Sequence, residues 1–322
     1  MISLNETTFD FDAISSQIIG GGILPISIDN TGVVRLLLGK ERYINHWRGS
    51  LKWSGFEGGR KPGEEIERTA AREFIEESMG IVKIQGREQT VDHITAFLRD
   101  DRYVARIVLC IVHGEQQERR YHVTYLVQVA YDNEYQSEFS IRRRAFVNLQ
   151  QKSNQMNKLG AQIVELNLPC ENEYYNDVKV KRIIKVEAPA PQTLSVEFYD
   201  EHDAFHVVKE RIDSDVVSMY MKWFTIKTTF VGDICEFSTG CKEAVTINMT
   251  EDNVVLHAKI NEDYIEKQTV QWWPLRDLKT VIKNGGYLNS EFFRAYFLPV
   301  LQRSIQEIED LLDTIDVGKN ER

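Results

Sequence analysis

Cysteine is scarce in this sequence, which has only four cysteines among 322 residues, Cys110, Cys170, Cys235 and Cys241. Their irregular spacing indicates neither a disulfide framework nor a zinc site. Cys235 and Cys241 form a C-x5-C pair, but a structural zinc site needs four ligands, and a second pair is missing. We therefore expect a fold that is stabilised by its hydrophobic core.

Long apolar runs are also missing, because no stretch approaches the roughly 20 residues that cross a bilayer. The opening residues MISLNETTFDFDAISSQ lack a basic region followed by an apolar one, so they do not resemble a signal peptide. We expect a soluble, cytoplasmic protein without a membrane partner. The net charge of -10 argues against a generally basic nucleic-acid binder, and the hydrophobic content of 42% is enough for a true core.

Acidic residues are concentrated in the segment at 58–81, GGRKPGEEIERTAAREFIEESMGI. An α-helix turns by about 100° per residue, so a helix here would place Glu73, Glu76 and Glu77 on one narrow face. Like charges at this spacing destabilise a helix by a few tenths of a kcal/mol per pair. A hard divalent cation such as Mg²⁺, which takes oxygen ligands, would explain the cluster. The alternative is an ordinary solvated acidic face.

The whole segment resembles the Nudix box, G-x5-E-x7-R-E-U-x-E-E-x-G-U, where U is a bulky aliphatic or aromatic residue. The matching positions are Gly58, Glu64, Arg72, Glu73, Phe74, Glu76, Glu77 and Gly80. One departure is visible, because Ser78 and Met79 separate Glu77 from Gly80 where the family pattern has a single residue. The extra residue follows all the proposed ligands, so it concerns the end of the helix and not the metal site.

This resemblance implies an acid anhydride hydrolase, a Nudix pyrophosphohydrolase that splits a nucleoside diphosphate linked to another group. Such enzymes use Mg²⁺ or Mn²⁺ and a water molecule that attacks phosphorus. Carried over to this chain, the cation ligands would be Glu73, Glu76, Glu77 and the backbone carbonyl of Gly58. The supporting residues of the box would be Arg72, which also counts among the catalytic residues, Glu64 and Gly80.

The resemblance leaves the general base open, because family members take it from the box or from a distant loop. From the box it would be Glu73 or Glu77. From outside it would be Glu262 or Glu266, just ahead of the QWWPL segment. For these last two glutamates an ordinary exposed loop charge is the competing interpretation.

The sequence is about twice as long as a minimal Nudix domain needs, so we expect a large insertion or a second domain. The resemblance implies an α/β fold, a Nudix-type α/β/α sandwich with a mixed sheet. Residues 1–16 would form an N-terminal arm, residues 17–132 and 266–322 the catalytic domain, and residues 133–265 a folded insertion.

Alternating apolar residues predict several strands, and helical periodicity predicts the elements that close the fold. The predicted strands are 17–29 and 32–41, joined as a hairpin at residues 30–32, followed by 93–98, 103–113, 121–131 and 269–275. The predicted helices near the end are 278–282 and 290–315, the second with Ser290 as its N-cap.

The insertion is locally basic despite the acidic total. Its phosphate-binding candidates are Arg142, Arg143, Arg144, Lys179, Lys181, Arg182 and Lys185. Basic side chains neutralise a nucleic-acid backbone and aromatic rings stack on bases, so the insertion is a candidate RNA-binding subdomain and Trp272 a candidate base-stacking residue. The competing interpretations are solvated helix and strand faces for the basic residues and core packing for Trp272.

A catalytic domain enlarged by a basic insertion resembles the messenger RNA decapping Nudix enzymes of large DNA viruses, which would place it in the host cytoplasm. Capped RNA would then be the substrate, and 7-methylguanosine diphosphate and 5′-monophosphorylated RNA the products. Alternatives are hydrolysis of diphosphoinositol polyphosphates or of small nucleotide diphosphates. A Nudix fold that only binds or regulates RNA is the alternative from another functional class, and such proteins generally lose box carboxylates.

Overall fold

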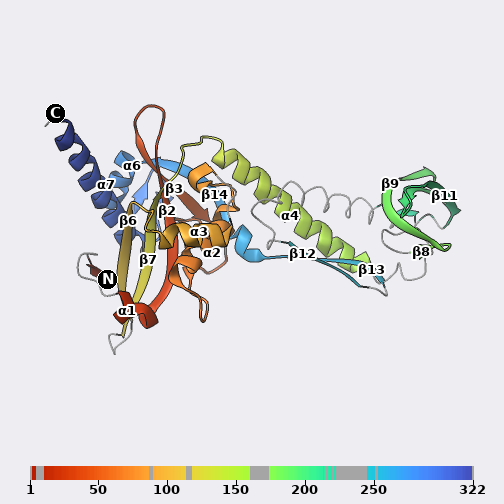
Figure 1. Ribbon diagram of the computed structural model, residues 1–322, viewed down its shortest axis with the longest axis horizontal. Coiled ribbons are helices and arrows are strands. Elements are labelled where there is room, and N and C mark those ends of the chain that lie inside the picture. The colour runs from red at the N-terminus through yellow and green to blue at the C-terminus, as the bar shows by residue number, and fades with distance from the viewer. Residues whose placement is uncertain are drawn as a thin grey trace. The chain divides into compact units, whose positions relative to one another are not determined.

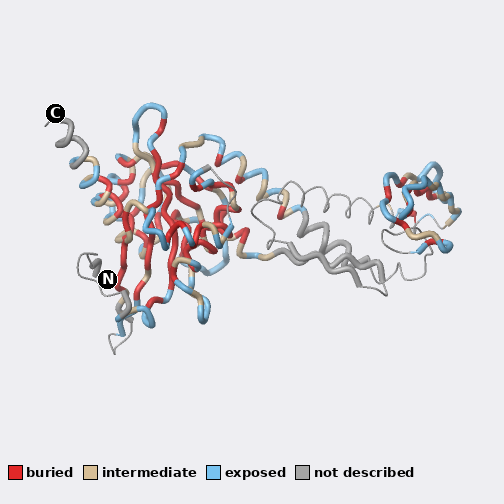
Figure 2. The backbone as a smooth tube through the Cα atoms, viewed as in Figure 1, coloured by how far each residue is buried: buried red, intermediate tan, exposed pale blue. Residues whose placement is uncertain are grey.

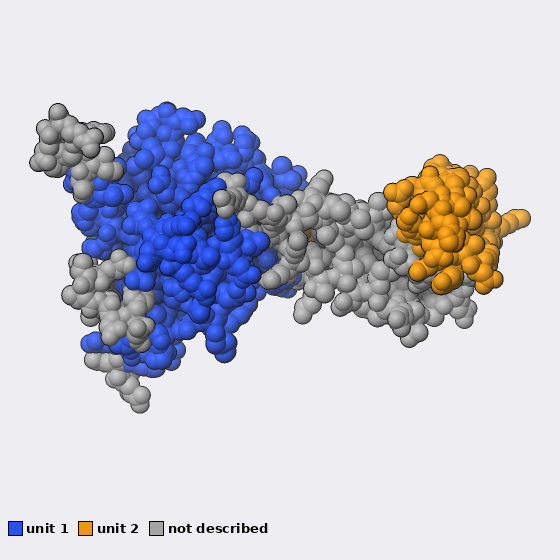
Figure 3. Space-filling model, viewed as in Figure 1, with its two compact units in different colours: residues 1–144, 238–244, 261–322 blue, residues 145–237, 245–260 orange. Residues whose placement is uncertain are grey.

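The computed structural model describes residues 2–4, 11–86, 90–113, 118–159, 174–212, 214, 217–218, 221, 245–250 and 253–320. The chain divides into two compact units, which Figure 3 colours separately. Unit 1 comprises residues 1–144, 238–244 and 261–322, and unit 2 comprises residues 145–237 and 245–260. The box segment and the closing segment of the chain therefore fall in the same unit.

Unit 1 is built on one eight-stranded sheet (Figure 1). Its strands are β1 (Ile2–Leu4), β2 (Ile18–Ile28), β3 (Val34–Glu41), β4 (Trp53–Ser54), β5 (Phe56–Gly59), β6 (Ala105–His113), β7 (Glu118–Gln128) and β14 (Lys267–Pro274). The order along the sheet is β1-β6-β7-β2-β3-β14, with β4 paired to β3 and β5 paired to β2. Because β2 and β7 run parallel while the other pairs are antiparallel, the sheet is mixed.

Helices cover both faces of this sheet. The described helical segments that lie wholly within unit 1 are α1 (Phe11–Ile14), η2 (Ser15–Gln17), α2 (Ile66–Ser78), η3 (Ile84–Gly86), α3 (Val91–Arg99), η5 (Glu262–Ile265), α6 (Leu275–Lys283) and α7 (Phe297–Asn320). Successive strand residues point to opposite faces. A Cβ on Gly21 of β2 would lie 2.6 Å from Ile66 of α2, whereas Leu24 belongs to the apolar cluster that contains Leu278 of α6 and Leu301 of α7. The predicted α/β/α sandwich with a mixed sheet is confirmed.

The core lies between the sheet and these helices, where Figure 2 shows a dense band of buried backbone. Trp53 and Trp273 meet edge to face there, with ring centroids 5.3 Å apart. Phe56 of β5 meets Phe74 of α2 in the same way at 5.6 Å. Such pairs contribute about 0.5–1.5 kcal/mol beyond the burial of their area, so the second pair anchors the box helix on the sheet.

Most of the predicted elements are present, and the first hairpin is one of them. Strands β2 and β3 pair antiparallel through Ile28 and Val34, and Gly32 in the connecting turn has a φ of 82°. Strands β6, β7 and β14 lie within two or three residues of the predicted bounds, and the helix predicted at 278–282 is the second half of α6.

Two predictions about local structure were wrong. Residues 93–98 form part of helix α3 and not a strand, because Ile94, Phe97 and Leu98 follow a helical spacing and Thr90 caps the helix by accepting a hydrogen bond from the His93 amide. Ser290 is not a helix cap. It has a φ of 67° in the turn between β15 (Tyr287–Leu288) and β16 (Glu291–Phe292), and α7 begins only at Phe297.

Unit 2 contains a four-stranded antiparallel sheet and a separate hairpin. The sheet has the order β11-β10-β9-β8, and its strands are β8 (Tyr174–Tyr175), β9 (Val178–Ala190), β10 (Thr193–Asp200) and β11 (Phe205–Arg211). The hairpin is β12 (Val245–Thr250) with β13 (Asn253–Ile260). The basic residues Arg142, Arg143 and Arg144 lie on α4 (Tyr135–Leu159), which begins in unit 1 and continues into unit 2.

Two sequence predictions about composition can be compared with the described residues. Cys110 is buried and is not in a disulfide, whereas Cys170, Cys235 and Cys241 lie outside the described residues. Within the described part of the chain, no helix combines the length and the apolar character that crossing a membrane requires.

Candidate metal centre

The box helix α2 starts and stops at residues with unusual backbone geometry. Ahead of it, Gly63 has a φ of 76°, and Glu65 takes the N-cap position. At its end, Met79 takes the left-handed conformation with a φ of 54°, and the amide of Gly80 donates to the carbonyl of Ile75 at 3.0 Å. Two residues in succession with positive φ give this exit a Schellman-like geometry. The residue that the family pattern lacks is thus accommodated after the helix, without disturbing the register of its glutamates.

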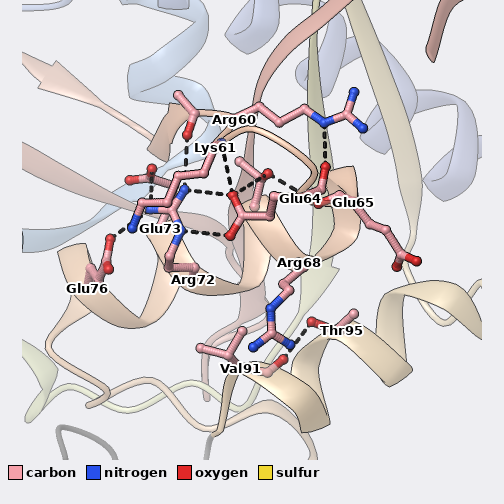
Figure 4. Close-up of polar contacts among 12 residues, drawn as sticks. Arg60, Lys61, Glu64, Glu65, Arg68, Arg72, Glu73, Glu76, Val91 and Thr95 are labelled. Atoms are coloured by element: carbon pink, nitrogen blue, oxygen red, sulfur yellow. Dashed lines mark hydrogen bonds and ion pairs between the residues drawn. The ribbon is translucent and has the colours of Figure 1, made fainter. Parts of the chain in front are cut away.

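Arg72 lies at the centre of a network of hydrogen bonds on one side of the site, as Figure 4 shows. Its guanidinium donates to both carboxylate oxygens of Glu64 at 3.0 Å. It also donates to Glu73 at 2.6 Å and to Glu76 at 3.0 Å. A fifth bond reaches the carbonyl of Gly59 at 3.0 Å. The planar fork of an arginine suits such multiple contacts, so Arg72 fixes the approach loop and the helix in one arrangement.

Glu77 lies on the inner side of the helix and is 3% exposed. One of its oxygens accepts from the amide of Glu57 at 2.7 Å, and the other lies 3.0 Å from the ammonium of Lys267. That ammonium also donates to Glu41 at 2.7 Å and to the hydroxyl of Ser54 at 2.9 Å. The side chains of Glu73 and Glu76 therefore share Arg72, whereas Glu77 is held by a different cation.

Burial raises the pKa of the three proposed ligands. Desolvation raises the pKa of Glu76 to about 7, although Arg72 opposes the shift. Desolvation also raises the pKa of Glu73 above its ordinary value, again against Arg72. Desolvation likewise raises the pKa of Glu77, against Lys267 and together with the nearby charges of Glu41 and Glu73. A cation bound beside these carboxylates would oppose the effect of burial and favour their charged forms.

The residues present fit a hard divalent cation. The donors are carboxylate oxygens, which Mg²⁺ prefers. Both carboxylate oxygens of Glu57 are buried without a hydrogen-bond partner in the described structure. Gly58 lies directly against Glu73, because a Cβ at Gly58 would be 2.3 Å from the Glu73 carboxylate. Among the described residues, no three acidic, histidine or cysteine side chains already converge as a ligand set, so an ion would have to share carboxylates with Arg72 and Lys267.

The two candidate bases outside the box differ in their surroundings. Glu266 caps the end of η5 and is half-buried, and desolvation raises its pKa, with further contributions from Glu41 and Glu73. Glu262 is exposed and pairs with Arg42 at 3.3 Å. Glu266 is thus close enough to Glu73 of the box to be influenced by its charge, whereas Glu262 pairs with a cation at the surface.

The basic candidates are distributed over both units. Arg142 donates to the carbonyl of Met79 at 3.1 Å and to Glu138, and Arg143 donates to the carbonyl of Lys267 at 2.9 Å, whereas Arg144 is exposed. The first two therefore support the helix exit and strand β14. Their role in binding phosphate stays a prediction.

The remaining basic candidates lie on β9 of unit 2. Lys181 pairs with Asp203, and Lys185 pairs with Glu187. Arg182 is exposed and lies over the ring of Tyr199, with 5.4 Å between the guanidinium carbon and the ring centroid. Lys179 is half-buried.

Trp272 is 9% exposed, and its indole nitrogen donates to the carbonyl of Asp132 at 2.8 Å. Its ring packs against Tyr131 and Tyr135, with centroids 5.5 Å and 6.2 Å away. Core packing, the competing interpretation of this residue, is thus what the structure shows. Stacking of Trp272 on a base stays a prediction.

Sequence reasoning missed the inner half of the centre, namely Lys267, Glu41, Ser54, Glu57 and Arg294. Arg294 donates to Glu41 at 2.7 Å. The only local signal was a charged residue at the edge of an apolar strand, as in LLLGKE for Glu41 and EKQTVQWW for Lys267. A charge at a strand end is usually solvated, so the pattern alone does not indicate burial.

Comparisons with protein-family profiles and with curated protein sequences find no match. Solved structures that resemble the chain include a Nudix hydrolase from M. smegmatis, with 16% identity, a TM-score of 0.23, and coverage of 36% of this chain and 63% of that one. An Ap4A hydrolase from C. elegans has 16% identity to this chain and a TM-score of 0.23, and the match covers 36% of this chain and 71% of the hydrolase. A third structure is a bifunctional NMN adenylyltransferase/ADP ribose pyrophosphatase from Francisella tularensis, complexed with AMP and a Mn ion. It has 14% identity to this chain and a TM-score of 0.25, and the match covers 36% of this chain and 29% of that protein. This chain thus spans less than two thirds of the length of the first of these proteins.

Proposed function

We propose that this chain is a divalent-metal-dependent pyrophosphohydrolase of the Nudix type. The observation that carries the proposal is the cluster of carboxylates on α2, namely the buried Glu76 and Glu77 and the half-buried Glu73, whose pKa values are all raised by desolvation although Arg72 or Lys267 opposes the shift. These three side chains and the carbonyl of Gly58 would hold the ion. When bound, a divalent ion neutralises phosphate oxygens and lowers the pKa of a coordinated water.

The chain's own residues then have separate tasks. Arg72 keeps Glu73 and Glu76 in place through its bonds to both carboxylates. Lys61 is exposed, and its charge acts on Glu73 and Glu76, so it is suited to meet a phosphate of the substrate. Glu266 would accept the proton from the attacking water, since a carboxylate with a raised pKa is a better base near neutral pH.

The substrate that we propose is the 5′ cap of messenger RNA, which would be cut to 7-methylguanosine diphosphate and 5′-monophosphorylated RNA. What supports an RNA substrate is the presence of exposed arginines, Arg144 on α4 and Arg182 on β9, because arginine binds phosphate and can stack on bases. The same cations favour diphosphoinositol polyphosphates as the second candidate substrate. A chain that only binds RNA is the outcome in which no substrate is turned over.

The decisive test offers capped RNA, free cap analogue and diphosphoinositol pentakisphosphate to the purified protein with Mg²⁺ and with Mn²⁺. We expect turnover of capped RNA to exceed that of the free analogue, and rising salt to slow the capped RNA selectively, since each phosphate contact releases counterions. Preference for the inositol compound would replace the substrate proposal. Absence of turnover with every substrate, or unchanged turnover by Glu77→Gln, would refute the enzyme proposal.

Two glycine variants provide a matched pair for the metal site. Gly58→Ala would place a Cβ 2.3 Å from the Glu73 carboxylate, whereas a Cβ at Gly59 would meet no atom within 4 Å. Gly58→Ala should therefore lower both Mn²⁺ affinity and turnover, while Gly59→Ala should leave both near wild type. Equal effects of the two substitutions would contradict the placement of the ion beside Glu73.

Arg144→Ser tests the contribution of RNA contacts without disturbing the fold. Arg142 and Arg143 each donate to a backbone carbonyl and are unsuitable for this purpose, whereas Arg144 is exposed. We expect Arg144→Ser to raise KM for capped RNA and to leave KM for the free cap analogue unchanged. An equal rise in KM for both substrates would mean that Arg144 does not contact the RNA beyond the cap.

A further inference from the structure

Lys267, the first residue of β14, is a completely buried lysine, with 0% of its side chain exposed. Its ammonium has three oxygen partners from three different elements. These are Glu41 of β3 at 2.7 Å, Ser54 of β4 at 2.9 Å and Glu77 of α2 at 3.0 Å. An ammonium has three protons, so each can be directed to one oxygen.

The aliphatic part of the Lys267 side chain packs against Gly39 of β3. A Cβ at Gly39 of β3 would lie 2.9–3.1 Å from the Cγ, Cδ and Cε atoms of Lys267. The absence of a side chain at Gly39 therefore makes the room through which Lys267 reaches Glu77. A lysine can be buried like this only if the ammonium is fully paired, because desolvating an unpaired charge costs several kcal/mol.

The two carboxylates that contact Lys267 differ in the number of their cationic partners. Glu41 accepts hydrogen bonds from both Lys267 and Arg294. Glu77 has Lys267 as its cationic partner and the amide of Glu57 as its other donor. The ammonium of Lys267 is thus enclosed by two carboxylates and a hydroxyl that pair it.

The oxygen set around Lys267 is also one that a divalent ion would accept, since it consists of two carboxylates and a hydroxyl. We propose that Lys267 is a built-in cation that occupies the inner position between Glu41 and Glu77, so that the centre binds one divalent ion fewer than its carboxylates would otherwise hold. The inference rests on the proposed function, because it concerns the metal ions of that site. The exchangeable ions would lie on the side of Glu73 and Glu76, and Glu77 would be shared between them and Lys267.

This assignment makes Lys267 a positioning residue. Its ammonium links Glu77 to Glu41 of β3 and Ser54 of β4 before any ion arrives, so the ligand on the inner side is preorganised. The same ammonium contributes one permanent positive charge to a centre in which the carboxylates outnumber the cations. An enzyme that relies on a fixed cation at one position needs to recruit fewer ions from solution.

The test is the number of Mn²⁺ ions bound per chain, measured by electron paramagnetic resonance, together with the dependence of Tm on Mn²⁺. Lys267→Met removes the charge and keeps an unbranched apolar side chain. We expect this variant to bind one Mn²⁺ more than wild type and to gain more Tm on Mn²⁺ addition, because an ion that binds the folded state stabilises it. Lys279→Met is the matched control, since Lys279 is 47% exposed on α6, and it should behave like wild type.

A second variant shows whether extra Mn²⁺ binds at the position left by the Lys267 ammonium or binds because the fold has become less stable. The double substitution Lys267→Met with Glu41→Gln removes one charge of each sign, so it should fold and should bind no more Mn²⁺ than wild type. An equal ion count in wild type and Lys267→Met would overturn the inference, and so would a Lys267→Met protein that remains unfolded at every Mn²⁺ concentration. Wild-type protein that binds no Mn²⁺ would instead refute the proposed function.

Discussion

Replacing Arg72 by methionine should destabilise unit 1 strongly. The side chain is 10% exposed and its three carboxylate partners, Glu64, Glu73 and Glu76, are between 4% and 13% exposed. Breaking a buried ion pair typically costs about 3–5 kcal/mol, because the remaining charges stay buried without a partner. For a unit of this size each kcal/mol lowers Tm by roughly 3 °C, so we expect a decrease of about 10 °C. Tryptophan fluorescence is a suitable probe, since Trp53 lies in the core of this unit.

Arg68→Met on the same helix is the matched control. Arg68 pairs with Asp92, but their side chains are 48% and 83% exposed, and an exposed pair contributes about 0–1 kcal/mol. Magnesium should recover part of the loss in Arg72→Met, because an ion can neutralise Glu73 and Glu76 while Glu64 stays unpaired. The reasoning would be refuted if Arg72→Met unfolded within about 1 kcal/mol of wild type, or if Arg68→Met lost as much stability.

Three further substitutions test local parts of the same architecture. Burial would raise the pKa of Glu64, but its bonds to Arg72 and neighbouring donors lower that pKa to about 2. A carboxylate with a lowered pKa stabilises the fold at pH values above its ordinary pKa of about 4.5, and this stabilisation is lost as the pH falls. Glu64→Gln should therefore flatten the loss of stability in acid titrations, and an unchanged acid limb would contradict this. Phe74→Ala, at a fully buried position, should cost about 3–5 kcal/mol in urea unfolding, whereas less than 1 kcal/mol would mean that α2 is loosely packed. Tyr125→Phe removes a bond of 2.9 Å to Glu67 and should cost about 0.5–1.5 kcal/mol, with no loss disproving that bond.

The sequence predicted the parts of unit 1 whose patterns are local. Helix α2 follows from the spacing of Ile66, Ala70 and Phe74, which are all buried, and β2 and β3 follow from two apolar runs around a turn. Residues 93–98 were misassigned because a short run of six residues fits either periodicity. The helix assignment depends on the cap at Thr90, which the alternation of apolar residues does not reveal.

The inner half of the centre could not be predicted, because its contacts join distant parts of the chain. Lys267 meets Glu41 and Glu77 only through the pairing of β14 with β3 and the packing of α2. Similarly, Arg143 looks like part of a surface basic run in the sequence, yet it donates to a backbone carbonyl of β14. The residues that neighbour Lys267 and Arg143 in the sequence do not indicate either role.

The place of Lys267 in the chain has a consequence for biosynthesis. Glu41 and Glu77 leave the ribosome long before Lys267, since all of unit 2 is translated in between. Until β14 adds to the edge of β3, the nascent sheet has two acidic groups with no ammonium to cover them, which makes early closure of the core around them costly. Completion of the candidate metal centre is thereby coupled to the return of the polypeptide from its inserted unit. A truncated product that ends before β14 should accordingly be recognised by chaperones and proteases, and should not persist as a folded protein.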